Sequence, residues 1–132
     1  MSLFEELIIP GVYKNIDLRL YFDNNYFRYD FIIKPGGEIS SIKIKSDKDI
    51  SIINDGNTVL FNKNLSQGQL NAYQYSQNNK KAIAAKFKIE NNLLNFDVGL
   101  YDNSKDLVID PIIFSTYFGA WASTQLRNIT IG

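Results

Sequence analysis

The sequence of 132 residues contains neither cysteine nor histidine. These absences exclude thiol nucleophiles, disulfides, histidine-based catalytic triads, haem ligation and zinc sites of the usual kind. Carboxylate chemistry is the one familiar catalytic route that stays open. We therefore expect neither a metal nor a cofactor.

Excess charge and long apolar runs are also missing. The 14 basic and 14 acidic residues give a formal net charge of zero, and the basic residues are scattered singly. Since nucleic-acid binding depends on a basic field, no nucleic-acid partner is expected. No apolar stretch approaches the roughly 20 residues of a membrane span, and no signal-like segment opens the sequence. The remaining composition, 45% hydrophobic and 21% charged, is that of an ordinary globular domain.

Apolar and polar residues alternate with a period of two through most of the sequence, as in strands with one buried face. The clearest alternating segments are 17–22, 26–33, 42–45, 86–89 and 94–98. Residues 80–88 contain several alanines, but the alternation continues into Phe87 and Ile89, which favours a strand. Residues 62–70 are polar and aperiodic, which predicts a loop.

Turn-forming residues separate these segments. Asn, Asp and Gly tolerate the positive φ of tight hairpins, and they occur at Asp23-Asn24-Asn25, Asp55-Gly56, Asn78-Asn79 and Asn91-Asn92. Pro35-Gly36-Gly37 fits a type II turn with glycine in the third position. Together the patterns predict an all-β fold, an antiparallel meander of about eight to ten short strands that forms a β-sandwich or an open barrel.

Several motifs occur in an order that resembles one family. They are residues 10–18 as an entry strand, the YDF–hydrophobic–PG segment 29–36, the AYQ strand 72–74, the closing segments 96–98, 101–102 and 107–111, and Ser115–Gly119. Together they resemble the uncharacterised β-rich domain found upstream of SBBP-type β-propeller repeats in secreted bacterial proteins. Ser115–Gly119 resembles the STYLGG opening of those repeats, although Ala120 replaces the second glycine.

The resemblance implies a secreted or cell-surface bacterial protein, often large and multidomain, without an assigned enzymatic activity. It implies a domain at 1–119, in which the natural domain begins upstream of this sequence, and a strand or the start of a repeat at 120–132. The residues shared with the family have structural interpretations: Asp17, Tyr29, Asp30, Pro35, Gly36, Asp110 and Pro111. Proline lacks an N–H, so Pro111 is expected to end or edge a strand, with Asp110 as a turn residue.

Carboxylates are the candidates for catalysis. Glycoside hydrolysis needs two carboxyl groups about 5 to 10 Å apart, one of them in an apolar setting. Four aspartates lie in the predicted strands or at their ends: Asp17, Asp30, Asp97 and Asp110. Their spacing selects no pair, and strand or turn aspartates are more often solvated or bonded to the backbone. The oxygen-rich segments 47–49 and 54–57 lack the ligand spacing of a calcium loop and fit hairpin turns better. We therefore expect that this protein is not an enzyme.

Aromatic residues offer a second candidate site. Tyr73 and Tyr75 share one strand face beside Gln74, while Tyr21 and Tyr26 flank a hairpin. Exposed tyrosines near amides could stack on sugar rings or anchor a protein. The alternative, which we favour, is cross-strand aromatic packing within the sheet.

The sequence therefore predicts a non-catalytic structural or interaction module of a larger exported bacterial surface protein. Its expected partners are neighbouring domains of the same polypeptide, with self-association through an unpaired edge strand. A glycan-binding module that uses the tyrosines is the alternative, and a carboxylate hydrolase the least favoured one.

Overall fold

The computed structural model describes residues 6–23, 26–45, 50–53, 55–61 and 65–113; for 22–23, 26–27, 61, 65–69 and 111–113 it describes the backbone alone. The described part consists of eleven strands and one short 3₁₀ turn, η1 (Ile39–Ser41). The first five strands are β1 (Glu6–Tyr13), β2 (Ile16–Asp23), β3 (Tyr26–Ile33), β4 (Ile44–Lys45) and β5 (Ile50–Ile53). The others are β6 (Thr58–Phe61), β7 (Leu65–Ser76), β8 (Asn79–Ile83), β9 (Ala85–Glu90), β10 (Leu93–Val98) and β11 (Leu107–Ile113).

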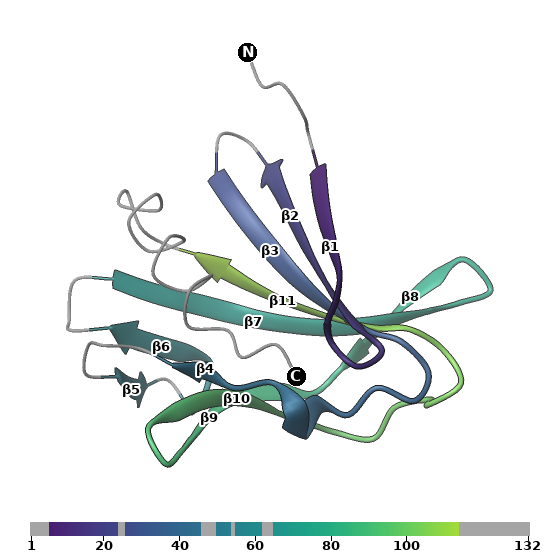
Figure 1. The fold of residues 1–132 in the computed structure, drawn as a ribbon. Coiled ribbons are helices and arrows are strands. Elements are labelled where there is room, and N and C mark those ends of the chain that lie inside the picture. The colour runs from purple at the N-terminus through teal and green to yellow at the C-terminus, as the bar shows by residue number, and fades with distance from the viewer. Residues whose placement is uncertain (1–5, 24–25, 46–49, 54, 62–64, 114–132) are drawn as a thin grey trace.

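The strands form two sheets. Within each sheet, every pair of neighbouring strands is antiparallel. The large sheet has the order β1-β2-β3-β11-β7-β6-β5, with β8 added to β7, and the small sheet has the order β4-β10-β9 (Figure 1). Neither sheet closes into a barrel, so the fold is an all-β sandwich. The predicted simple meander is corrected in two respects: β11, the last described strand, lies between β3 and β7, and β4 pairs with β10.

The core fills the space between the two sheets. As the alternation predicted, Leu18, Phe31, Ile44, Phe87 and Phe96 are all buried. The ring of Phe96 in the small sheet lies 5.8 Å from that of Phe31 and 5.7 Å from that of Phe87, measured between centroids. The Phe31–Phe96 contact joins the two layers, and the Phe87–Phe96 contact lies within the small sheet.

The hairpin turns follow the predicted chemistry closely. Asn91 and Asn92 have φ of 53° and 63°, as a two-residue hairpin turn requires. In the 34–37 turn Gly36 has φ of 89°, and the Gly37 N–H donates to the Lys34 carbonyl at 2.8 Å. Two predictions fall elsewhere. The β7–β8 turn is Gln77-Asn78, one residue earlier than expected, and Asn24 and Asn25 lie outside the described residues.

Three local predictions are wrong. Residues 65–70 are not a loop but the first half of β7, because this segment pairs with β6 on one side and β11 on the other. Residues 10–18 are not one strand, since Lys14-Asn15 form the β1–β2 turn, with Asn15 at φ 59°. Pro111 does not end a strand. It lies inside β11 at a shift in the β11–β7 register, and such irregularities are where sheets accommodate proline.

The alanine-containing segment is extended, as predicted. β8 ends at Ile83 and β9 begins at Ala85, so the chain passes from the large sheet to the small one at Ala84. No helix in the described residues is long and apolar enough to cross a membrane.

Candidate functional site

The face of the large sheet turned away from the small sheet, here called the outer face, carries an ionic cluster. The alternation that buries Tyr29 and Phe31 in the core sends Asp30 to this face, and the same rule places Arg19 and Tyr21 there from β2. Asp110 reaches it from β11. Although neither sheet in the described part of the chain covers the outer face, the exposed fraction is 0% for Asp30 and 8% for Asp110.

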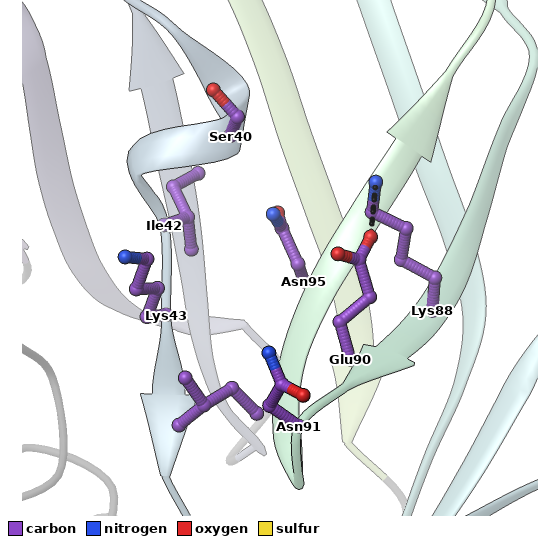
Figure 2. Close-up of a pocket in the computed structure, with 8 residues that line it drawn as sticks. Ser40, Ile42, Lys43, Lys88, Glu90, Asn91 and Asn95 are labelled. Atoms are coloured by element: carbon purple, nitrogen blue, oxygen red, sulfur yellow. Dashed lines mark ion pairs between the residues drawn. The ribbon is translucent and has the colours of Figure 1, made fainter.

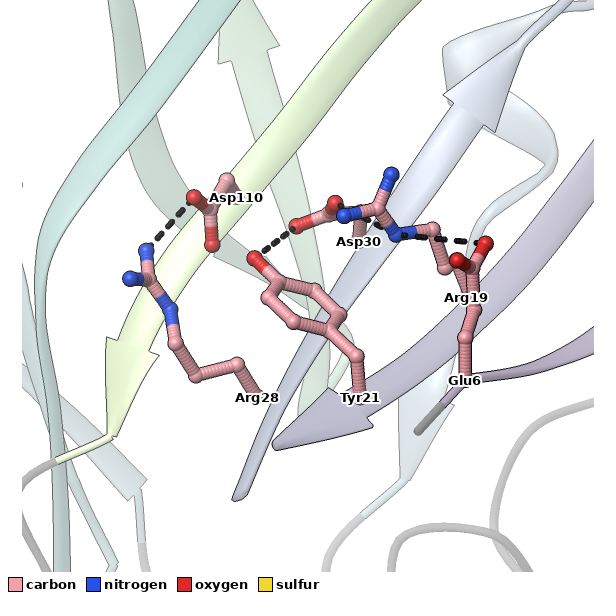
Figure 3. A network of polar contacts seen from close by, with 6 residues as sticks. All are labelled: Glu6, Arg19, Tyr21, Arg28, Asp30 and Asp110. Atoms are coloured by element: carbon pink, nitrogen blue, oxygen red, sulfur yellow. Dashed lines mark hydrogen bonds and ion pairs between the residues drawn. The ribbon is translucent and has the colours of Figure 1, made fainter. Parts of the chain in front are cut away.

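Side chains of four strands form the cluster (Figure 3). An Arg28 Nη donates to Asp110 Oδ2 at 2.6 Å, and the Tyr21 hydroxyl donates to Asp30 Oδ1 at 3.2 Å. Arg19 Nε lies 3.6 Å from Asp30 Oδ2 and 3.7 Å from Glu6 Oε1 on β1. Arg19 is therefore shared between a buried and an exposed carboxylate.

The Tyr21 ring lies beneath both guanidinium groups. The Arg19 Cζ is 4.4 Å from the ring centroid, and the Arg28 Cζ is 5.8 Å from it. Both distances are within cation–π range. Burial, followed by the charges of Asp30 and Asp110, raises the pKa of the Tyr21 hydroxyl, so it remains a hydrogen-bond donor at neutral pH.

Asp30 and Asp110 face each other across the β3–β11 seam. Ile109 pairs with Phe31, and continuing that register by one residue places the two aspartates opposite one another. Burial raises the pKa of Asp30 to about 7, and the charge of the neighbouring Asp110 acts in the same direction. Arg19 and Tyr21 oppose the shift but do not cancel it.

Each of the two carboxyl groups has one oxygen atom with a hydrogen bond and one without. Asp30 Oδ2 and Asp110 Oδ1 are inaccessible to solvent and have no hydrogen-bond partner. Buried carboxylate oxygens of this kind are costly unless a proton or a donor satisfies them. The arrangement is therefore suited to holding a proton. Among the described residues, no group of three or more acidic side chains is placed to hold a metal ion.

The four tyrosines that were predicted as a candidate binding site do not form one group. Tyr73 and Tyr75 lie on the outer face with ring centroids 5.6 Å apart in an edge-to-face arrangement. The Lys80 ammonium is 4.0 Å from the Tyr73 ring, and Tyr75 is 57% exposed. Tyr21 belongs to the ionic cluster, and the side chain of Tyr26 lies outside the described residues.

The Gln74 side chain does not join those of Tyr73 and Tyr75. It is 4% exposed and on the opposite face of β7 from the two tyrosines. Its Nε2 donates to the Asp102 carbonyl at 2.7 Å, and its Oε1 accepts from the Asp102 N–H at 3.0 Å. Gln74 thus holds the loop before β11 against β7.

Other predicted residues have local structural contacts. Asp17 Oδ1 accepts from the Gly11 N–H at 3.0 Å, where β1 shifts register, and Asp17 also lies 3.5 Å from the Lys34 ammonium. The Asp102 carboxylate accepts from the Ser104 N–H and hydroxyl. Asp110 is not a turn residue, because it lies within β11 and bonds to Arg28.

A shallow pocket of about 280 Å³ lies on the small sheet, between η1 and the β9–β10 hairpin (Figure 2). Ser40 and Lys43 line one wall, and Asn91 and Asn95 line the other. The Lys88 ammonium and the Glu90 carboxylate, 3.1 Å apart, neutralise each other at its rim. This pocket is remote from the ionic cluster, since it is formed by different strands.

Sequence reasoning singled out Asp30, Asp110 and Tyr21 separately but missed Arg19 and Arg28. Arg19 lies between the buried Leu18 and Leu20, and Arg28 precedes the buried Tyr29, which is the pattern of any polar residue on the outward strand face. The only available signal was their position on the same strand face as the aspartates. This position indicates an ionic cluster only when the pairing of β3 with β11 is known.

The fold and this cluster define the protein as an all-β sandwich domain with a buried acid pair on one sheet face. The chain belongs to the family described as a domain of unknown function, DUF7948, which it matches over residues 1–112. Searches among curated proteins and among solved structures found no match.

Proposed function

We propose that this domain is a non-catalytic interaction module that binds an extended chain segment by strand addition at β1. The observation that supports this most directly is the exposed, apolar first half of β1. It ends the large sheet, and Leu7 and Ile8 are exposed there. An unpaired strand edge offers a row of N–H and C=O groups to another strand.

The other end of the large sheet is less open. The Gly56 carbonyl, in the β5–β6 turn, accepts from the Phe87 N–H of β9 at 2.8 Å. The small sheet therefore approaches the β5 end. At the β1 end, the Tyr13 hydroxyl bonds to the backbone of Lys43. That contact covers only the second half of β1, and no other strand of the described residues pairs with Glu6–Ile9 on the outer side.

The open stretch is self-complementary, which favours a second copy of this chain as the occupant in isolation. In an antiparallel pair centred on Ile8, Leu7 of one copy faces Ile9 of the other, and Glu6 faces Pro10. No like charges meet, and the zero net charge of the chain adds no repulsion. Pro10 and the bulge that follows it limit the ladder to about four residues.

Support for a non-catalytic role comes from the acid pair itself. Asp30 is fully buried and Asp110 nearly so. A substrate therefore has no direct access to the two carboxyl groups that lie close enough to act together. General acid–base catalysis needs such access.

We further propose that the domain is part of a larger exported bacterial surface protein. The support is the ordered set of motifs that resembles domains upstream of propeller repeats, including Ser115–Gly119, which lies outside the described residues. In that setting the natural occupant of the β1 edge would be a segment of a neighbouring domain.

Light scattering after size exclusion over a range of protein concentrations tests the strand-addition proposal. The wild type is expected to dimerise as concentration rises, and Ile8→Lys is expected to shift the equilibrium to monomer. Ile53→Lys is the matched control, because Ile53 is similarly exposed, 41% against 48%, but lies on β5. A monomer at every concentration contradicts self-association, and dissociation by Ile53→Lys places the contact elsewhere.

The tyrosine pair supports a second candidate, carbohydrate binding. The edge-to-face contact fixes Tyr73, and the exposed Tyr75 ring is available for stacking. A glycan array with wild type and Tyr75→Ala tests this. Signals that vanish in the variant support the proposal, whereas signals absent from the wild type or unchanged in the variant contradict it.

A further inference from the structure

We infer that Asp30 and Asp110 form a proton-binding site whose occupancy controls how tightly β3 and β11 are joined. This inference is independent of the proposed strand addition, because it concerns an internal seam of the sheet. Its ligand is the hydrogen ion.

The acid pair lies where two strands separate. The β3–β11 ladder comprises Leu107, Val108 and Ile109 paired with Ile33, Ile32 and Phe31, and it stops immediately before the aspartates. Beyond this point β11 continues alongside β7, with a register shift in the β11–β7 pairing between Asp110 and Ile112. In Figure 1, β3 fans away from β11 beyond this point together with β1 and β2.

The side chains therefore hold the strands together where the backbone ladder has ended. The Arg28 guanidinium on β3 crosses to Asp110 on β11 at 2.6 Å. Asp30 lies beside this bridge, on the same strand as Arg28, and adds a second negative charge when ionised. Two carboxylates side by side in a buried setting repel unless one of them carries a proton.

Geometry indicates which carboxyl group takes the proton. Asp110 has a close, charge-assisted hydrogen bond to Arg28. Asp30 has only the Tyr21 hydroxyl at 3.2 Å and Arg19 at 3.6 Å, and Arg19 is shared with Glu6. The Asp30 carboxyl is thus the member with the weaker compensation, and protonation removes its charge.

The electrostatic surroundings can be described strand by strand. The ionisable groups around Asp30 come from five strands. They are Glu6 on β1, Arg19 and Tyr21 on β2, Arg28 on β3, Asp110 on β11 and Tyr73 on β7. With both aspartates and Glu6 ionised, three negative charges face two positive ones. One bound proton restores neutrality.

The sign of the effect on stability follows from the pKa of Asp30. In the folded protein this pKa is raised to about 7 from its ordinary value of 3.8, so the native state binds a proton that the unfolded state releases. The contribution to stability is fully present below the unfolded pKa and is lost as pH rises through about 7.

The absence of histidine and cysteine makes this titration unusually simple to assign. Ordinarily histidine is the side chain that titrates between pH 5 and 8, and this chain has none. A proton taken up by the folded protein near neutral pH therefore points to the acid pair, with the α-amino group as the one ordinary competitor.

The test is denaturant unfolding of the whole chain from about pH 5.5 to 7.5, for wild type, Asp30→Asn and Asp97→Asn. For the wild type, the unfolding equilibrium constant should rise by up to tenfold per pH unit below pH 7 and level off above it. Asp30→Asn mimics the protonated carboxyl and should abolish the slope. Asp97→Asn, which changes an exposed aspartate on β10, should retain it.

Two measurements on the folded protein complete the test. Carbon-13 carboxyl NMR of the wild type should show one aspartate that titrates near pH 7, and Asp110→Asn should move that titration to lower pH. Hydrogen exchange, corrected for its intrinsic pH dependence, should show loss of protection in Phe31–Ile33 and Leu107–Ile109 above pH 7. A flat wild-type stability profile, no carboxyl titration above pH 5.5, or pH-independent protection overturns the inference.

Discussion

Replacement of Gln74 separates a structural from a ligand-binding role for this residue. In Gln74→Ala the two close hydrogen bonds to the Asp102 backbone are lost, together with the buried methylenes of the side chain. Each bond contributes about 1 kcal/mol net, because the exposed Asp102 backbone can be rehydrated. With the lost apolar burial, we expect a destabilisation of about 2–3 kcal/mol.

Gln74→Glu provides a sharper form of the same experiment. The carboxylate keeps the shape and still accepts from the Asp102 N–H, but it cannot donate to the carbonyl groups of Asp102, Lys105 and Asp106 that surround Nε2. We expect a larger loss at neutral pH than in the alanine variant. Burial raises the folded pKa of the new carboxyl group, so stability recovers as pH falls and protonation restores a donor.

Urea unfolding followed by tyrosine and tryptophan fluorescence measures both variants, with Tyr75→Ala as the control. Tyr75 is exposed, so its truncation should lower stability by less than about 1 kcal/mol. The reasoning is refuted if Gln74→Ala shifts the urea midpoint no more than Tyr75→Ala does. It is also refuted if Gln74→Glu is indifferent to pH.

Two further pairs of substitutions test the packing by thermal melting. Gly37→Ala should destabilise by about 1–3 kcal/mol, because an added Cβ would lie 2.6 Å from the Asn15 carbonyl oxygen; Gly11→Ala meets open space at φ 65° and should cost only about 1 kcal/mol. Phe96→Ala should cost about 3–5 kcal/mol, since Phe96 joins the two sheets, whereas the fully exposed Leu100→Ala should stay within about 0.5 kcal/mol. Equal melting temperatures within either pair would contradict the assigned contacts.

The sequence predicts the fold wherever information is local. The two-residue alternation identifies the strands around Leu18, Phe31, Phe87 and Phe96, and the Asn91-Asn92 pair marks a hairpin turn. Both signals arise within a few residues of chain. They depend on side-chain direction and on backbone conformation, which no distant pairing has to supply.

The missed elements depend on distant segments. Residues 65–70 carry little apolar pattern, yet they are extended because β6 and β11 pair with their backbone on both sides. The insertion of β11 between β3 and β7 joins residues separated by most of the chain. Asp30 and Asp110 share this difficulty: each was visible in the sequence, but their meeting follows from a register that no local pattern encodes.

Pro111 connects the fold to the proton site. It lies in a central strand, at a register shift in the pairing of β11 with β7, and the regular β3–β11 ladder ends two residues earlier, at Ile109. A regular ladder would have continued to hold the strands by backbone hydrogen bonds. The interrupted ladder assigns that task to Arg28, Asp30 and Asp110, whose interactions depend on ionisation.

Arg19 is the residue that the two proposals have in common. It lies between Asp30, inside the sheet, and Glu6, at the open end of β1. When Asp30 loses its proton, its charge attracts Arg19 more strongly, and Glu6 is left with less of the shared guanidinium. An ionised, less compensated Glu6 disfavours a second strand at the β1 edge, because pairing there removes it from water. If both sites act as proposed, proton binding at Asp30 and strand addition at β1 favour each other. By thermodynamic linkage, strand addition at β1 then raises the proton affinity of Asp30.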